Sequence, residues 1–221
     1  MCYSYIAALI FLSGKIDDVL TSRKVSRKFL HAMIGNLPLI MPFFTDNLFP
    51  FLVASPFVIV TFLASPLCPL NPIKERLRAL SDLTEEGHHT GLILYAISYS
   101  LLALLFGIKP YVVASGIFPM AYGDSAAAIV GESRGKHRFK VFEGKSLEGS
   151  LAMFLGSLIS LIIGMYYFSS IYGFSFYSQI FPVLSVSLIT TVAEAISPRG
   201  LDNIAIPLLG ALTFISLGGG A

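Results

Sequence analysis

The stretch Pro110–Gly135, with the sequence PYVVASGIFPMAYGDSAAAIVGESRG, combines a long apolar run with an acidic side chain. The apolar part, Pro110–Val130, reaches the length of about 20 residues that a helix needs to cross the hydrocarbon core of a bilayer. Asp124 lies inside this run. Ionisable groups at membrane depth are costly unless they are paired or hydrated, so they are candidates for functional sites. The stretch therefore predicts a membrane helix that carries a functional carboxylate.

The composition of the 221-residue chain indicates the same class of protein. Residues of the set AVILMFWYC make up 55% of the sequence and charged residues 13%, and the mean hydropathy is +0.76. Soluble domains carry about 25% charged residues, so this composition excludes a disordered chain, a coiled coil and a typical cytosolic enzyme. The net charge of +2 is too small for a dedicated nucleic-acid-binding protein. We expect a single integral membrane domain over residues 1–221.

Eight apolar runs predict an all-α bundle of seven to eight transmembrane helices. The first, second and last runs are shorter than about 17 residues, the lower limit for a spanning helix, so they either cross with little tilt or are re-entrant. With all eight runs spanning and the N-terminus outside, the inside loops carry 14 of the 15 Lys and Arg residues, which is the bias that the positive-inside rule describes. The runs are Met1–Ser13, Phe29–Phe44, Leu48–Cys68, Thr90–Gly107, Pro110–Val130, Gly149–Ser169, Ser178–Ile196 and Ile204–Leu217.

Four polar side chains lie inside the apolar runs or at their ends: His31, Asp124, Glu194 and Asp202. The predicted topology turns all four toward the cytoplasmic side, where the basic loops also lie. Because such residues are functional-site candidates by default, we expect the site at this face. The predicted location is the cell membrane or the endoplasmic reticulum, with the chain crossing it several times.

Small residues recur every four positions at Gly123, Ala127, Gly131 and Gly135. On a helix this spacing produces one smooth face, where another backbone or a phosphate chain can approach closely. Such faces are also common in membrane helix packing without any ligand. Asp124 adjoins the face and is a candidate ligand for Mg²⁺, which commonly binds one or two carboxylates together with substrate phosphates.

A basic loop connects this segment to the next predicted helix. Its side chains, among them Arg138 and Lys145, provide enough positive charge for a triphosphate. Lys145-Ser146 stands directly before the helix, whose N-terminal amides would attract an anion. A basic cytoplasmic loop can equally be only a determinant of topology. The combination of a buried acid, a small face and Lys-Ser-Leu-Glu-Gly favours a catalytic site.

This combination resembles the nucleotide-binding signature of the polyprenol kinases, a family with dolichol kinase, phytol kinase and the CTP-dependent diacylglycerol kinase of yeast. The signature is Asp-x-x-Ala-x-x-x-Gly-x-x-x-Gly, a spacer and Lys-Ser/Thr-x-Glu-Gly. The family's first motif, Arg-Lys-x-x-His, and its last motif, Glu…Asp-Asn, also fit. The resemblance therefore covers about residues 23–210. The matching positions are Asp124, Ala127, Gly131, Gly135, Lys145, Ser146, Glu148, Gly149, then Arg27, Lys28, His31, and Glu194, Asp202, Asn203.

The resemblance implies transfer of the γ-phosphate of CTP to the hydroxyl of a membrane isoprenoid alcohol of the dolichol or polyprenol type. Phosphoryl transfer depends mainly on positioning and charge neutralisation, and the roles are assigned accordingly. The catalytic candidates are Asp124, Glu194, Asp202 and His31, and the Mg²⁺ ligands are Asp124, Asp202 and Glu148. The nucleotide-binding candidates are Gly123, Ser125, Ala127, Gly131, Gly135, Arg138, Lys145, Ser146, Glu148, Gly149, Asn203, Arg27 and Lys28.

Two other functions compete with this hypothesis. A CTP:phosphatidate-type cytidylyltransferase also uses CTP, Mg²⁺ and a membrane lipid, but it produces diphosphate and a CDP-lipid. A transporter would favour an inverted repeat and polar residues near mid-membrane, whereas here no repeat is evident and the polar groups lie on one side. The expected partners are the lipid alcohol, CTP and the bilayer, with no nucleic acid. The residues do not distinguish a dolichol-like polyprenol from phytol, geranylgeraniol or diacylglycerol.

Overall fold

The computed structural model describes residues 31–69, 90–139, 145–198 and 200–221, together with residue 29 and seven positions among the first twelve, which are helical. Within these ranges the secondary structure is helical, and the only β-type pairing is an isolated bridge between Arg138 and Ser146. The predicted all-α class is therefore confirmed. The helices are α3 (Leu48–Ala64), α6 (Gly91–Phe106), α7 (Pro110–Phe118), α8 (Asp124–Arg134), α9 (Leu147–Tyr172), α10 (Ile180–Ile196) and α11 (Asp202–Ser216).

The second apolar run, Phe29–Phe44, does not form the continuous helix that its composition suggested. Helical backbone covers residues 31–34 and then gives way to two short 3₁₀ turns, η1 (Leu37–Leu39) and η2 (Met41–Phe43). Each turn contains a proline near its start, and proline removes a backbone N–H donor and disrupts a helix interior. The two prolines thus explain why an apolar run does not become a single membrane helix here.

Three helical segments in the described part of the chain are long and apolar enough to cross a membrane: Pro110–Arg134, Leu147–Tyr172 and Tyr177–Ile196. Leu48–Ala64, Gly91–Phe106 and Asp202–Ser216 are apolar but shorter. The first segment joins α7 to α8 through a π-helical turn, η3 (Pro119–Gly123), and the last adds the 3₁₀ turn η4 (Tyr177–Gln179) before α10. These lengths support membrane association, while the full count of seven to eight spans remains a prediction.

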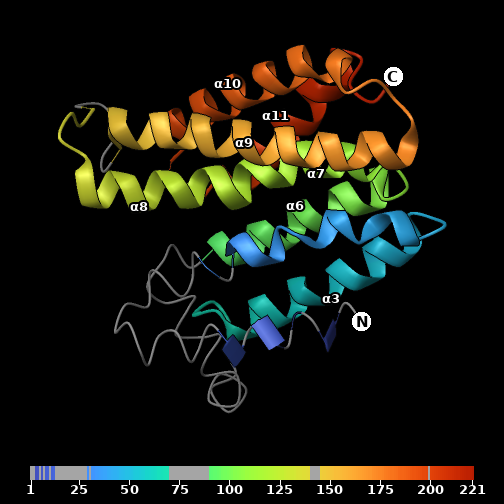
Figure 1. The fold of residues 1–221 in the computed structure, drawn as a ribbon. Helices are drawn as coiled ribbons and strands as arrows, with labels where there is room; N and C mark the ends of the chain where they lie inside the picture. The colour runs from blue at the N-terminus through green and yellow to red at the C-terminus, as the bar shows by residue number, and fades with distance from the viewer. Residues whose placement is uncertain are drawn as a thin grey trace.

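The helices pack side by side, with α8 and α9 forming an antiparallel pair (Figure 1). Helix α10 packs against α9 and α11, α11 packs against α7 and α6, and α3 packs against α6 (Figure 1). Glycine permits the closest crossing, between α7 and α11. A Cβ at Gly116 would overlap the backbone of Pro207, and one at Gly210 would lie 2.6 Å from the Ser115 carbonyl oxygen. Such close backbone approach is typical of small residues at membrane helix contacts.

The connections bring four helix ends together at one end of the bundle. Helix α8 ends and α9 begins there, at the left of Figure 1, whereas the connection from α9 to α10 lies at the opposite end. The end of α10 and the start of α11 join the first pair of ends, because Lys145 before α9 contacts side chains from both helices. Glu194 and Asp202, two of the polar residues singled out in the sequence, lie at these ends.

Candidate active site

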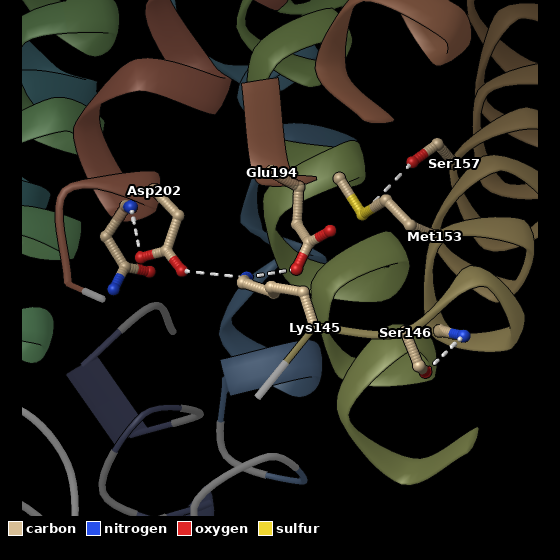
Figure 2. Close-up of polar contacts among 8 residues, drawn as sticks. Lys145, Ser146, Met153, Ser157, Glu194 and Asp202 are labelled. Atoms are coloured by element: carbon tan, nitrogen blue, oxygen red, sulfur yellow. Dashed lines mark hydrogen bonds and ion pairs between the residues drawn. The ribbon is translucent and has the colours of Figure 1, made fainter. Parts of the chain in front are cut away.

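Lys145 is the centre of a charged cluster between α10 and α11. Its ammonium donates a hydrogen bond to Glu194 Oε1 near the end of α10, and its Nζ lies 3.9 Å from Oδ2 of Asp202 at the start of α11. Figure 2 shows the lysine side chain reaching between the two carboxylates. The structure therefore brings together three residues that are separated by up to 57 positions in the sequence. All three were predicted from the sequence as site residues.

Asp124 adds a third carboxylate to this neighbourhood. It is the first residue of α8 and is partly buried. Its charge and that of Asp202 both act on the Glu194 carboxyl group, which is itself buried. Buried acidic groups of like charge are unfavourable unless a cation lies among them, and Lys145 is that cation here. The cluster is thus suited to hold positive charge where the carboxylates converge.

Backbone pairing fixes the position of Lys145. The Phe139 amide donates to the Lys145 carbonyl at 3.1 Å, and the Leu147 amide donates to the His137 carbonyl at 3.0 Å. These bonds flank the bridge between Arg138 and Ser146 and hold the two sides of the α8–α9 connection together. Arg138 is exposed beside this pairing. The predicted phosphate-binding lysine is therefore held by main-chain bonds directly before α9.

Ser146 is the N-cap of α9. Its Oγ accepts a hydrogen bond from the Gly149 amide at 3.1 Å, and the residue is buried. Two glycines of the small face make room for this hydroxyl, since a Cβ at Gly131 would lie 3.4 Å from Ser146 Oγ and one at Gly135 would lie 2.8 Å from it. Serine is a favoured N-cap residue because its oxygen satisfies a free amide of the first turn. The motif residue thus defines where α9 begins.

The small face of α8 is used for helix packing along most of its length. An added Cβ at Gly123 would overlap Ser157 and approach the Met153 sulfur to 2.7 Å, and one at Gly149 would lie 3.2 Å from the Ala127 carbonyl oxygen. The spacing left open whether another backbone or a phosphate chain approaches this face. In the structure the α9 backbone approaches it. Ser125 contributes to the same region through a bond to the Ala121 carbonyl at 2.6 Å.

Glu148 points to a different partner from the other predicted metal ligands. Its Oε1 lies 2.7 Å from Nδ1 of His137, and both carboxylate oxygens accept from the His137 amide at 3.3 Å. This pair is part of the α8–α9 connection rather than of the Lys145 contacts. The structure therefore pairs Asp202 with Lys145 and Glu148 with His137, while the charge of Asp124 acts on Glu194.

Asn203 connects α11 to α6. Its backbone carbonyl accepts a hydrogen bond from Ser98 Oγ at 2.8 Å, and its amide donates to the Asp202 carboxylate at 2.9 Å. Gly91 at the start of α6 also lies close, since a Cβ there would be 3.2 Å from the Asn203 side-chain nitrogen. Helix α6 thus supports the end of α11 that carries Asp202.

His31 is buried against α6. Its ring centroid lies 4.1 Å from that of Tyr95 in an edge-on arrangement, and its backbone carbonyl accepts a hydrogen bond from the Tyr95 hydroxyl at 3.1 Å. The other two residues of the predicted opening motif, Arg27 and Lys28, lie outside the described residues. The histidine is therefore held by a residue of α6.

Tyr95 and Ser98 were not predicted from the sequence as part of the site. Most Tyr and Phe side chains in so apolar a chain are expected to face lipid or the bundle core, so an aromatic residue alone does not indicate a site. The pattern that could have identified these two residues is their spacing of three within an apolar helix, which places their polar groups on neighbouring parts of one face.

The donor set of the charged cluster fits a divalent cation only together with a substrate. Among the described residues, no three His, Cys, Asp or Glu side chains are grouped closely enough to form a complete metal site. Mg²⁺, however, commonly uses one or two carboxylates and completes its shell with water and phosphate oxygens. Asp202, whose Oδ2 lies 3.9 Å from Lys145 Nζ, and Asp124, whose charge acts on Glu194, are the two candidates for that role.

Comparison with known proteins identifies relatives over nearly the whole chain. A phytol kinase of Synechocystis sp. is 30% identical over 215 residues, which cover 95% of this chain and 86% of the relative. A probable chloroplastic phytol kinase 3 of Glycine max and the chloroplastic phytol kinase 1 of Arabidopsis thaliana are each 27% identical, with 95% and 97% of this chain and 69% and 73% of the relatives covered. No protein-family model matches the chain, and no solved structure matches it. The extent of the first match, together with the motif residues gathered around Lys145, establishes that the chain belongs to the polyprenol kinase family, alongside the phytol kinases.

Proposed function

We propose that this protein is a membrane lipid kinase that transfers the γ-phosphate of CTP to the hydroxyl of an isoprenoid alcohol. The observation that carries the proposal is the position of Lys145 between Glu194 and Asp202, in a chain whose relatives are named phytol kinases. A phosphate-binding cation beside carboxylates is the arrangement that phosphoryl transfer requires, because catalysis rests on positioning and on neutralising charge.

The acceptor that we propose is an alcohol of the phytol or geranylgeraniol type. The family resemblance implied an alcohol of the dolichol or polyprenol type, the residues themselves do not distinguish it from phytol, and the names of the relatives favour the shorter class. Both classes present a primary hydroxyl at the end of a branched hydrocarbon chain. In the proposed arrangement the alcohol reaches the site laterally from the membrane leaflet, while the nucleotide enters from the aqueous side that the basic loops face.

Lys145 is proposed to move from the carboxylates to the phosphates when the nucleotide binds. Within the described residues its ammonium makes one hydrogen bond to Glu194 and one longer ion pair with Asp202, so on nucleotide binding it would exchange one charged partner for another. Arg27, Lys28 and Arg138 are proposed to add positive charge at the same phosphates. Ser146 can donate its hydroxyl proton while its oxygen still accepts from the α9 amide.

The glycine and alanine positions are proposed to act through geometry. Because Gly123, Ala127 and Gly131 let the α8 backbone approach α9, they set the distance between Asp124 and Lys145. Gly135 and Gly149 leave space around the Ser146 hydroxyl. Nucleotide contacts from this face would then come from backbone groups near the end of α8.

Asp124 and Asp202 are proposed to hold Mg²⁺ together with the nucleotide phosphates. When bound, the ion would neutralise charge on the phosphate oxygens. Glu148, paired with His137, is proposed to support this arrangement from the α8–α9 connection, and Asn203 to orient Asp202, to which its amide is bonded.

The reacting hydroxyl loses its proton as its oxygen forms a bond to the γ-phosphorus and the bond from that phosphorus to CDP breaks. We assign this proton to Glu194, whose carboxylate becomes available as Lys145 turns to the phosphates. His31 is the other candidate base from the sequence, but its ring packs against Tyr95. Its proposed role is to position the alcohol beside the cluster.

The test uses purified protein in detergent with Mg²⁺ and CTP labelled on the γ-phosphate. Phytol, geranylgeraniol, a dolichol-type polyprenol and diacylglycerol are offered separately, with the Asp124→Asn variant as the matched control. We expect label in the lipid fraction with phytol or geranylgeraniol, and CDP as the second product. Label released as diphosphate in a reaction that needs phosphatidate would instead identify a cytidylyltransferase. Competition by unlabelled ATP or GTP tests the choice of CTP.

A further inference from the structure

We infer that an apolar hollow between α3, α6 and the N-terminal segment receives the hydrocarbon chain of the acceptor alcohol. The inference rests on the proposed function and adds to it the place where the lipid lies. The hollow is open on one side, and its lining includes Ile34, Leu37, Phe57, Leu92, Tyr95 and Tyr99.

The lining is suited to hydrocarbon rather than to a polar ligand. Most of the lining residues are aliphatic or aromatic. Two of the polar groups are already used elsewhere: the Thr61 hydroxyl donates to the Phe57 carbonyl at 2.7 Å within α3, and the Tyr95 hydroxyl donates to the His31 carbonyl. A nucleotide or sugar would lose its hydrogen bonds to water here without replacement, which is unfavourable. A branched isoprenoid chain loses none.

Helix α6 joins this hollow to the charged cluster. Tyr95 lines the hollow and contacts the His31 ring, while Ser98, three residues further along the helix, holds the backbone of Asn203. Gly91, next to the lining residue Leu92, lies beside the Asn203 side chain. Asn203 adjoins Asp202, which faces Lys145. A lipid whose chain fills the hollow would therefore place its polar end at the side of α6 where Asp202 lies.

This arrangement fits an alcohol that carries its only polar group at one end. The chain is buried without polar partners, and the hydroxyl emerges past Tyr95 and His31 toward the carboxylates. The hollow would thus select acceptors by chain length and branching, while the charged cluster performs the transfer. Tyr95 becomes a specificity-determining residue, because it lines the hollow and also contacts the His31 ring.

The first test narrows the hollow. Ala96→Phe adds bulk at a buried lining position of α6, and Leu104→Phe adds bulk to the same helix at an exposed position as the matched control. Both variants are assayed with geraniol (ten carbons) and with phytol, under the conditions given above. We expect kcat/KM for phytol to fall at least about tenfold in Ala96→Phe, the scale of misfit in an apolar pocket, with geraniol and the KM for CTP little changed. Leu104→Phe should resemble the unaltered protein.

The outcomes separate the two proposals. If the unaltered protein phosphorylates no isoprenoid alcohol, the proposed function fails. If it is active and Ala96→Phe lowers the rates with both alcohols equally, or changes neither, the hollow is not the chain site. Thermal unfolding in detergent shows whether each variant is folded.

A second measurement uses the unaltered chain and so does not depend on the folding of a variant. A phytol analogue with a diazirine near the end of its chain is photolysed with the protein, and adducts are mapped by mass spectrometry. We expect adducts on α3 and α6, suppressed by excess phytol. Adducts confined to the exposed faces of α9 and α10 would overturn the inference. The same holds for labelling that phospholipid suppresses and phytol does not.

Discussion

Two acid–base pairs at the same end of the molecule differ in burial, and the difference distinguishes the candidate site from a more exposed contact. Lys145 and Glu148 are three residues apart, yet each pairs in a different environment. The Lys145 and Glu194 side chains are 17% and 4% exposed, whereas those of His137 and Glu148 are 77% and 26% exposed. Exposed ion pairs contribute little to stability. A buried pair carries a desolvation penalty, so its presence in an apolar bundle favours a functional reason.

The largest effect is expected when a charge is removed from the buried cluster without loss of volume. Asp124→Asn should lower phosphate transfer by about 10²–10³-fold or more, the scale for loss of one electrostatic group that acts on the transition state. Initial rates with labelled CTP and phytol measure the effect, and the melting temperature reports the fold. A variant that retains normal rates would remove Asp124 from the site.

Lys145→Met should affect both binding and stability. The KM for CTP is expected to rise about 10- to 100-fold, the equivalent of one hydrogen bond to a charged group. Removing one partner of a buried pair costs about 3–5 kcal/mol, because Glu194 is left without its cation. The free energy of unfolding in detergent and the dependence of rate on CTP concentration are the measurements.

A double variant sharpens this test of the buried pair. Adding Glu194→Gln to Lys145→Met should recover much of the lost stability, since no uncompensated charge remains, but none of the activity. The two single variants and the double variant form a thermodynamic cycle that isolates the coupling between the side chains. Additive losses of stability would mean that the two residues do not interact in the membrane-embedded protein.

Glu148→Gln and His137→Ala should have smaller effects. Loss of this pair is expected to change the free energy of unfolding little, because solvent screens exposed charges, and to change the transfer rate only severalfold. The concentration of Mg²⁺ that gives half-maximal rate is the discriminating measurement. A large increase in Glu148→Gln alone would mean that this carboxylate binds the metal directly, and the contrast between the two pairs would be lost.

The smallest expected effect is that of salt on stability. Raising ionic strength from about 0.01 to 1 M shortens the screening length from about 30 to 3 Å. The small stabilisation from His137 and Glu148 should disappear over this range, so that unaltered protein and His137→Ala converge in melting temperature. The difference between unaltered protein and Lys145→Met should persist, because buried charges are screened much less. Equal salt sensitivity of both pairs would contradict the assigned burial.

Much of the fold follows from hydrophobic runs, and the exceptions have physical causes. The run Gly149–Ser169 corresponds to Leu147–Tyr172 in the structure, and Ser178–Ile196 corresponds to Tyr177–Ile196. Length and apolarity suffice there, because a helix satisfies its own backbone in an apolar setting. They do not suffice in the run that contains Pro38 and Pro42, where composition favours a membrane segment but the backbone leaves the helix.

The sequence identified which residues belong to the candidate site, but not which of them contact one another. Motif spacing identified Lys145, Glu194 and Asp202, whereas the contact of Lys145 with the other two depends on how α10 and α11 end beside α9. The four-residue spacing of small residues could not decide between helix packing and phosphate binding, because both need the same smooth face. The positions of Met153 and Ser157 against Gly123 show that this end of the face is used for packing. Tyr95 was missed because its role depends on His31, which is distant in sequence.

The π-helical turn η3 sets the rotational phase of Asp124. A π turn contains one more residue per turn than an α-helix, and this one, Pro119–Gly123, ends directly before Asp124. Deleting Ala121 would remove the extra residue of this turn and rotate everything after it by about 100° relative to α7. Asp124 would then face away from Glu194, although no residue of the charged cluster had changed. The segment Pro110–Arg134 thus consists of two helices that are rotated about the axis relative to each other. The orientation of α7 suits the buried core and that of α8 suits the carboxylates, and the one extra residue of η3 accounts for the rotation between them.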